Sequence, residues 1–485
     1  MYIGIDLGTS SLKCVLVDAA QNVVATATEP LTVSRPAPAH SEQDPDSWWQ
    51  ACQRTLDRLA ASQPQAMQDV LGIGLSGQMH GATLLDSADR ALRPCILWND
   101  GRAAMECAEM ETAWSELRAV TGNIAMPGFT APKLLWVKKH EPDIFAATAR
   151  VLLPKAYLRL KLTGEHVEEM SDAAGTLWLD VARRDWSDAA LAATGLARRH
   201  MPRLVEGSAP AGRLRSELAQ RWGMRASPIL AGGAGDNAAG AISLGAVRPG
   251  DAFISLGTSG VLWATTAGFA PNPTAAVHTF CHCLPQTWHQ MGVILSAASC
   301  LSWLARTLGE TESALLAPLG RKPARPCDVL FLPYLSGERT PHNDAQIRGA
   351  FIGLAHETDR DMLVQAVMEG VAFALKDCLL ALQTAGTGIA KADAIGGGAR
   401  SPLWLSILAN VLDMPLTQVT SAEVSGAFGA ARLARLAVTG ENVADICLPP
   451  ARGGTVEPDS VLREAYAGAY ARYRKLYPAL KEMNS

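Results

Sequence analysis

An aspartate stands beside a short turn of small residues near the start of the chain. Asp6 is followed by Leu7 and then by the turn Gly8-Thr9-Ser10. Free backbone N–H groups and short hydroxyls in such a turn can hold phosphate oxygens without adding bulk. Most single turns of this kind are plain hairpins in which the aspartate caps the turn. Phosphate binding therefore needs a second observation.

A second turn of the same composition, Gly257-Thr258-Ser259, follows roughly 250 residues later. Predicted strands flank each turn, at residues 2–6 and 12–17 in the first half and at 252–256 and 261–265 in the second. We interpret this repetition as an internal repeat of one domain type. Two matching turns, one in each repeat, suggest the two sides of a clamp around phosphate.

Asp236 is a further candidate for chemistry. It lies in the small-residue run Gly232 to Gly240, after a predicted strand at 228–231 and at the start of a predicted helix. Asp strongly favours the helix N-cap position, which is the ordinary role here. A carboxylate within hydrogen-bond reach could also take the proton of a hydroxyl group that attacks phosphorus. The residues alone leave both interpretations open.

The elements that must position these residues form two sets. In the first half, helical spacing runs over 48–60 and begins again at 130, and a buried strand is predicted at 70–75. In the second half, helices are predicted at 360–382, 402–412 and 425–437. A chain of 485 residues exceeds what one core usually covers. We predict an N-terminal domain, 1–245, and a C-terminal domain, 246–485, joined near the turn signal Arg248-Pro249-Gly250.

Composition excludes several classes of protein. A net charge of −4 and a pI of about 6.2 argue against a nucleic-acid partner. The stretch 252–305 lacks charged residues, but prolines, histidines and glycines interrupt it, so no membrane span is predicted. The N-terminus has no signal-peptide pattern, and ten cysteines are scattered along the chain. Reduced thiols in a cytoplasmic protein are the better interpretation.

Other motifs lead to weaker interpretations. Residues 72–77 fit G-x-G-x-x-G and 233–238 fit G-x-G-x-x-A, yet neither has the strand, helix and later acid of a dinucleotide site. No P-loop and no protein-kinase signature occurs. A metal site is conceivable at a histidine and cysteine group, but no second pair has zinc-ligand spacing. That group, interpreted as buried structure, comprises His278, Cys281, His282 and Cys283.

The order of the motifs resembles a known family. Residues 4–10 and 255–259 resemble the two phosphate motifs of the actin-like ATPases, and 395–401 resembles their adenosine motif. Residues 128–140 match the first signature of the FGGY carbohydrate kinases. Residues 349–369 resemble the second, with Met362 where a polar side chain is usual. The resemblance covers nearly the whole chain.

This resemblance implies an α/β fold of two ribonuclease-H-like (actin-like ATPase) domains with an interdomain cleft. It implies that ATP with Mg²⁺ binds in the cleft, that Asp6 faces the metal, and that Asp236 is the catalytic base. A homodimer is also expected from it. The implied nucleotide contacts are Gly8, Thr9, Ser10, Gly257, Thr258, Ser259, Gly397, Gly398 and Arg400.

The sugar is expected on the first domain, where polar residues follow strands. A sugar requires paired donors and acceptors beside an apolar or aromatic surface. The pattern of these polar residues resembles that of the family members that phosphorylate D-xylulose to D-xylulose 5-phosphate. Another ketose or polyol, such as ribulose or glycerol, and a non-kinase actin-like ATPase remain alternatives. Lys133, in the first signature, has no assigned role. The expected sugar contacts are Met79, His80, Trp98, Asn99, Asp100 and Asp236.

Overall fold

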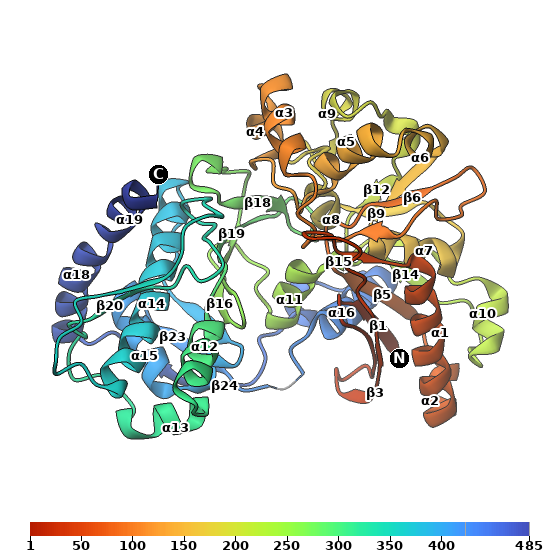
Figure 1. Ribbon diagram of the computed structural model, residues 1–485. Coiled ribbons are helices and arrows are strands. Elements are labelled where there is room, and N and C mark those ends of the chain that lie inside the picture. Colours follow the sequence, from red (N-terminus) through yellow and green to blue (C-terminus); the bar gives the residue numbers. More distant parts are fainter. Residues whose placement is uncertain (422, 485) are drawn as a thin grey trace.

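A seven-stranded mixed sheet forms the centre of the first half of the protein (Figure 1). The computed structural model describes residues 1–421 and 423–484. The central strand β1 pairs antiparallel with β2 and parallel with β5. In sheet order the strands are β13 (Pro210–Arg213), β14 (Ile229–Ala231), β5 (Gly72–Gly77), β1 (Tyr2–Leu7), β2 (Ser11–Val17) and β3 (Val23–Pro30), with the short β15 (Ala234–Gly235) also paired to β5.

The second half has a seven-stranded sheet of related topology. Its central strand β16 pairs antiparallel with β17 and parallel with β22, as β1 does with β2 and β5. The internal repeat predicted from the two turns is therefore confirmed. In sheet order the strands are β18 (His278–Cys281), β19 (Trp288–Ile294), β17 (Gly260–Thr266), β16 (Ala252–Leu256), β22 (Ala392–Ile395), β23 (Leu416–Val419) and β24 (Arg452–Val456).

Helices cover the sheets close to where the sequence predicts them. In α1, Asp44 accepts a hydrogen bond from the N–H of Asp46, Pro45 occupies the first turn, and Trp48 lies on the buried face. Helix α1 therefore begins before and ends after the predicted range of 48–60. The main helices are α1 (Pro45–Ser62), α5 (Thr130–His140), α7 (Pro154–Thr163), α11 (Asp236–Leu244), α12 (Ala298–Leu308), α14 (Arg360–Thr384), α15 (Pro402–Leu412), α16 (Gly426–Thr439) and α18 (Ser460–Tyr473).

Helix α16 departs from the predicted division of the chain. It comes late in the sequence, yet it packs against β1 and β5 of the first sheet and against α11 (Figure 1). Only glycine allows this approach: a Cβ on Gly4 would lie 1.8 Å from the carbonyl oxygen of Ala427, and one on Gly74 equally close to that of Ala430. The boundary at 245/246 thus separates the two sheets but assigns α16 to the wrong half in space.

Three large apolar clusters support this arrangement. One fills the second half around β16 and α14, and another lies between the first sheet and α1. A third contains side chains from both halves, among them Leu134 of α5 and Phe280 of β18. The halves are therefore joined by packed side chains as well as by the backbone. Within the described residues no helix is long and apolar enough to cross a membrane.

Candidate functional site

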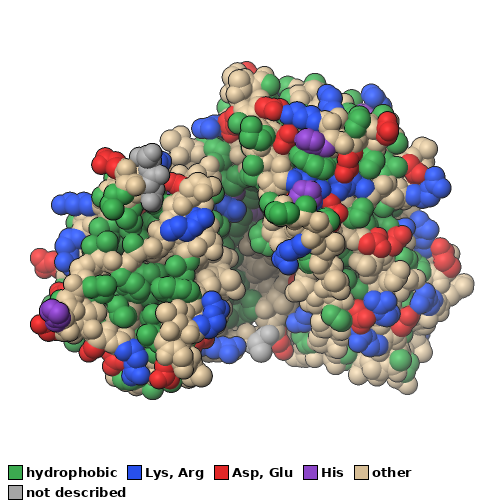
Figure 2. Space-filling view, in the orientation of Figure 1, with side chains coloured by type: hydrophobic (Ala, Val, Ile, Leu, Met, Phe, Trp, Pro, Cys, Tyr) green, Lys and Arg blue, Asp and Glu red, His purple; other side chains and the backbone are tan. Residues whose placement is uncertain are grey.

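The two phosphate turns lie on different halves of the molecule, and the surface between the halves is deeply hollowed (Figures 1 and 2). In the first turn, the Thr9 hydroxyl donates to Gln78 Oε1 and accepts from Trp98 Nε1, each at 2.9 Å. Thr258 and Ser259 in the second turn are exposed. The first turn is thus tied to the predicted sugar residues, whereas the second is open.

The predicted adenosine motif lies beside the second turn. Gly396 has φ +92°, and a Cβ there would lie 2.6 Å from the carbonyl oxygen of Leu256, the last residue of β16. This position therefore requires glycine. Gly397 has no atom within 4 Å of where its Cβ would be, so a flat ligand could approach its backbone. Together with exposed Arg400, these residues border the turn that begins at Gly257.

Asp236 is the first residue of α11, and the helix cap is Gly235. The helix-cap role considered from the sequence is therefore wrong. Asp236 Oδ1 accepts hydrogen bonds from the backbone and side-chain nitrogens of Asn237, at 2.7 and 3.0 Å. Its Oδ2 makes no hydrogen bond within the described part of the chain, and solvent reaches the side chain although protein atoms surround it closely. This oxygen is available to accept a proton.

Asp6 and Asp236 influence each other although some 230 residues separate them. The pKa of Asp236 is raised to about 6, first because the surrounding protein displaces water and second because the Asp6 carboxylate adds negative charge. Burial also raises the pKa of Asp6, which accepts a 2.7 Å hydrogen bond from the Ser76 hydroxyl. The two carboxylates therefore belong to one site.

Gly426, which sequence reasoning missed, completes the surroundings of Asp6. A Cβ at this first residue of α16 would lie 2.8 Å from Asp6 Oδ1 and 2.7 Å from the Ser76 hydroxyl. A glycine gives no chemical signal in a sequence. Asp6 Oδ2 has no hydrogen bond within residues 1–421 and 423–484. One open carboxylate oxygen beside a phosphate turn fits a hydrated Mg²⁺, which takes few protein carboxylates.

His80 is held in a defined orientation. Its backbone has φ +68°, and its Nδ1 lies 2.6 Å from the carbonyl oxygen of Gly175. A carbonyl only accepts, so Nδ1 carries the proton and Nε2 presents a lone pair. Burial lowers the pKa of His80 to about 3, which keeps the ring neutral. His80 Nε2 is therefore able to accept a hydrogen bond.

Lys133, to which sequence analysis assigned no role, supports His80. The side chain is fully buried, and its Nζ donates to the carbonyl oxygens of His80 at 2.9 Å and Gly128 at 2.8 Å. The Thr130 hydroxyl donates to the same His80 carbonyl at 3.1 Å. Burial lowers the pKa of Lys133 to about 7. Lys133 thus fixes the strained backbone that carries the imidazole.

The other predicted sugar residues divide into two groups. Met79 packs against Gly235, where an added Cβ would meet its Cγ at 3.0 Å, so Met79 adjoins Asp236. Trp98 and Asn99 are exposed on the loop after β7 (Cys95–Ile96), with Trp98 hydrogen-bonded to Thr9. The structure brings these residues to the same side of the cleft as the first turn.

Asp100 differs from its neighbours. Its carboxylate is only 2% exposed. Oδ1 accepts from the backbone and Nε nitrogens of Arg102, and Oδ2 accepts from Ser41 N at 2.6 Å and Arg102 Nη2 at 2.7 Å. Both oxygens are therefore already occupied. The structure favours a supporting role that orders this loop over the direct sugar contact predicted from sequence.

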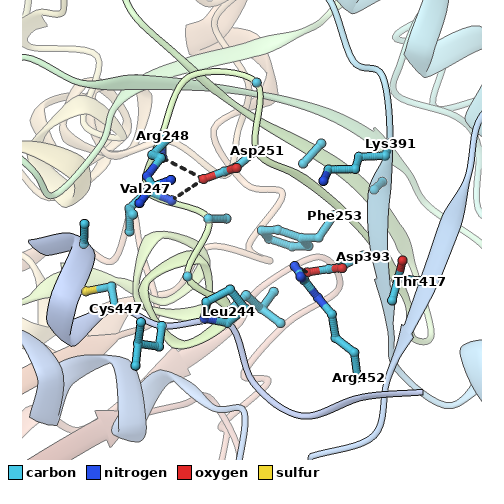
Figure 3. Close-up of a pocket in the computed structure, with 18 residues that line it drawn as sticks. Leu244, Val247, Arg248, Asp251, Phe253, Lys391, Asp393, Thr417, Cys447 and Arg452 are labelled. Carbon is cyan, nitrogen blue, oxygen red and sulfur yellow. Dashed lines mark hydrogen bonds and ion pairs between the residues drawn. The ribbon is translucent and has the colours of Figure 1, made fainter. Parts of the chain in front are cut away.

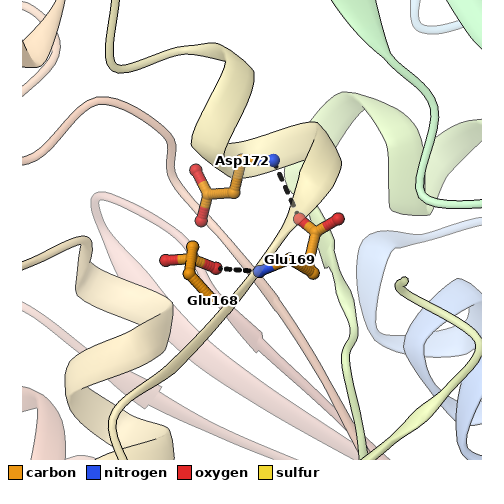
Figure 4. Close-up of side chains that lie close together, drawn as sticks. All are labelled: Glu168, Glu169 and Asp172. Carbon is orange, nitrogen blue, oxygen red and sulfur yellow. Dashed lines mark hydrogen bonds between the residues drawn. The ribbon is translucent and has the colours of Figure 1, made fainter. Parts of the chain in front are cut away.

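Figure 4 shows an acidic cluster that sequence reasoning missed. Glu168, Glu169 and Asp172 are buried close together. The buried Lys155 ammonium contacts Glu168 and lies 3.5 Å from a carboxylate oxygen of each of the other two, so it occupies the place a metal would take. The Ser171 hydroxyl links this network to the backbone N–H of Gly235, at 3.0 Å. The cluster therefore anchors the residue before Asp236.

A pocket of about 270 Å³ lies away from the turns (Figure 3). It is lined by the starts of β16 and β22, whereas the phosphate and adenosine turns follow the ends of these strands. Its walls include 244–253 and 444–452, where the chain passes between the halves. Asp251 accepts from the N–H groups of Val247 and Arg248 there. This pocket lies where the chain passes between the halves, and neither Asp6 nor Asp236 lines it.

Comparison with known proteins identifies the family of this chain. Models of the N- and C-terminal domains of the FGGY family of carbohydrate kinases match residues 1–243 and 252–438. A xylulose kinase of Escherichia coli (strain K12) is 51% identical over 483 residues, covering 99% of each chain. One of Bacillus subtilis (strain 168) is 35% identical over 489 residues, covering 100% of this chain and 98% of its own. The crystal structure of a "xyloylose kinase" from Brucella ovis has a TM-score of 0.98 at 56% identity, covering 99% of each chain. This chain belongs to the FGGY family of carbohydrate kinases.

Proposed function

We propose that this protein transfers the γ-phosphoryl group of ATP to D-xylulose, giving D-xylulose 5-phosphate and ADP. The observation that carries the proposal is the Oδ2 of exposed Asp236, which has no hydrogen bond within the described residues, in a molecule whose two phosphate turns lie on different halves. The full-length relatives named xylulose kinases support the choice of sugar. A chaperone-like or filament-forming ATPase would have no use for a base placed beside a sugar-binding histidine.

In this mechanism Asp236 accepts the proton of the C5 hydroxyl as the hydroxyl oxygen attacks the γ-phosphorus. The new O–P bond forms while the bond from the γ-phosphorus to the bridging oxygen of ADP breaks. His80 Nε2 accepts a hydrogen bond from another hydroxyl of the sugar, and Met79 supplies apolar contact beside Asp236. The two turns reach one nucleotide when the cleft closes, which also excludes water as a competing acceptor.

Asp6 would hold Mg²⁺, with Ser76 and the start of α16 fixing its carboxylate. When bound, the ion would offset the negative charge on the phosphate oxygens. We also propose a cytoplasmic location, which the ten free, buried cysteines support. A homodimer remains a prediction from the family resemblance.

A coupled ADP-release assay over pentuloses, hexuloses and polyols tests the function. We expect the highest kcat/KM with D-xylulose, and very slow ATP turnover when no sugar is present. A preference for ribulose or glycerol would overturn the assigned substrate but leave a sugar kinase. Rapid ATP turnover that no sugar accelerates would favour a non-kinase ATPase.

The pKa of Asp236 predicts the pH dependence of the reaction. Because burial and Asp6 raise this pKa to about 6, the base is ionised above pH 6 and protonated below it. We expect log kcat/KM for D-xylulose to be level above this value and to fall by about one unit per pH unit below it. A bound cation near Asp6 would shift this acid limb to lower pH.

A histidine variant shows which group titrates. Burial lowers the pKa of His80 to about 3, so His80→Asn should reduce the rate without moving the limb. A profile that stays flat from pH 4 to 8 in the parent protein would contradict Asp236 as the base. So would a limb that disappears in His80→Asn.

A further inference from the structure

Arg339 is a partly buried arginine whose guanidinium forms no ion pair among residues 1–421 and 423–484. It follows β20 (Leu330–Leu332) in the second half of the protein. The neighbouring Glu338 acts on it through its charge, but Glu338 Oε1 accepts from the backbone N–H groups of Leu295 at 3.0 Å and Arg339 at 2.8 Å and makes no hydrogen bond to the guanidinium. Enclosing a cation is costly, and burial lowers the pKa of Arg339 by more than the charge of Glu338 raises it. A guanidinium in this setting suggests that it binds a polar group of a ligand.

The side chain of Arg339 has one hydrogen bond. Its Nη1 lies 3.3 Å from His278 Nε2. His278 Nδ1 lies 3.1 Å from Asn123 Oδ1, and Asn123 is oriented by donating to the Thr279 carbonyl at 3.0 Å. Nδ1 of His278 therefore carries the proton, and Nε2 accepts from Arg339. The remaining guanidinium N–H groups have no hydrogen bond within the described residues.

An aromatic cluster connects Arg339 to the sugar-side histidine. The ring of His278 lies 5.6 Å from that of Phe129, which lies 4.8 Å edge-on to the ring of His80. Phe280 stacks on His278 at 5.6 Å and lies 6.2 Å from His80. The charge of Arg339 contributes to the low pKa of His80. The guanidinium and the imidazole therefore both adjoin this aromatic cluster, one from each half of the protein.

The site residues described so far provide no hydrogen-bond donor for the keto oxygen of a ketose. Neutral His80 presents a lone pair at Nε2, and Asp236 Oδ2 is an acceptor, so both suit hydroxyl groups. A keto oxygen carries no hydrogen and can only accept. Lys133 is already used by two backbone carbonyls. The Arg339 guanidinium can only donate hydrogen bonds, and most of its N–H groups have no acceptor within the described residues.

We propose that Arg339 donates to the C2 keto oxygen of the sugar and selects ketoses over the corresponding polyols. The inference rests on the proposed function and names a specificity residue for it. A polyol carries a C2 hydroxyl, whose proton would have to find an acceptor where Arg339 offers only donors. An unpaired polar group of this kind costs about 1–3 kcal/mol, which is roughly ten- to a hundredfold in affinity.

The test compares Arg339→Met with the parent, using D-xylulose and its two C2-reduced forms, xylitol and D-arabitol. Calorimetry without ATP gives the dissociation constant of each. We expect D-xylulose binding to weaken by ten- to a hundredfold and polyol binding to change by less than about threefold. Arg339→Lys keeps a charged donor and should retain part of the preference. The KM for ATP should be unaltered at saturating sugar.

Two controls separate recognition from folding. Arg339→Met removes an uncompensated charge, so its Tm should not fall. Arg348→Met, at an exposed arginine of the same segment, should match the parent in every measurement. Equal loss of ketose and polyol binding in Arg339→Met would overturn the inference. If the parent prefers ribulose, the proposed substrate fails but the same comparison with ribulose and its polyols still tests Arg339. A parent that prefers a polyol overturns both.

Discussion

Replacing Asp236 by asparagine should lower kcat by roughly two to four orders of magnitude, the usual contribution of a positioned base. The amide keeps the size of the carboxylate, and its oxygen can still accept from the N–H groups of Asn237, as Oδ1 does now at 2.7 and 3.0 Å. It cannot take the proton of the attacking hydroxyl. Single-turnover phosphoryl transfer in a quenched-flow assay measures the loss directly.

Sugar affinity distinguishes a catalytic role of Asp236 from a binding role. The dissociation constant for D-xylulose in Asp236→Asn should change far less than kcat, because the amide can still contact the hydroxyl. Asp328→Asn provides the matched exchange at an exposed aspartate that pairs with Arg325 at 2.9 Å, and it should behave as the parent. Near-normal turnover in Asp236→Asn would remove this residue from the mechanism.

A valine at Gly74 should prevent the first half from folding normally. Its Cβ would lie 1.8 Å from the carbonyl oxygen of Ala430. Both are backbone positions, in β5 and α16, so a side-chain rotation cannot relieve the clash. Strand β5 and helix α16 would have to separate, which exposes the small apolar face between them. Overpacking in cores costs typically 1–3 kcal/mol and more where the backbone must move. We expect a fall in Tm of about 10 °C or a loss of soluble protein.

Gly240 offers the control for this substitution. It lies in α11 and has no atom within 4 Å of where its Cβ would be. Gly240→Ala should therefore stabilise the protein slightly, by about 0.5–1 kcal/mol, because alanine is the better helix former. Thermal unfolding followed by circular dichroism compares the two. A Gly74→Val protein with the Tm of the parent would show that α16 does not pack as described.

The sequence predicts the elements of this fold because local signals mark them. A Gly-Thr-Ser turn between two apolar runs identifies each phosphate hairpin, and both hairpins are present where expected. The start signals at Asp44 and Pro45 likewise locate α1. Such signals act over a few residues, so they survive without knowledge of the tertiary structure.

Features that depend on distant contacts were not predicted. Nothing near residue 426 indicates that the start of α16 lies against Asp6. The close approach is possible because Gly426 has no side chain, and a glycine alone does not signal such a contact. Asp100 has the residue type of a sugar contact, but Ser41 and Arg102 occupy its oxygens. The importance of Arg339 lies in guanidinium N–H groups that have no hydrogen-bond partner within the described residues, which only the packed structure reveals. These properties arise from tertiary packing and leave no local pattern.

The late position of α16 also affects how the chain is synthesised. The sheet that carries Asp6 is complete in sequence before residue 245, but the face containing Gly4 and Gly74 remains uncovered until α16 leaves the ribosome. About 200 residues separate these events, which takes roughly 10–40 s at about 5–20 residues per second. During that interval the nascent first half presents an apolar sheet face to the cell. Its final folding step must therefore wait for nearly the whole polypeptide, so the two halves mature together.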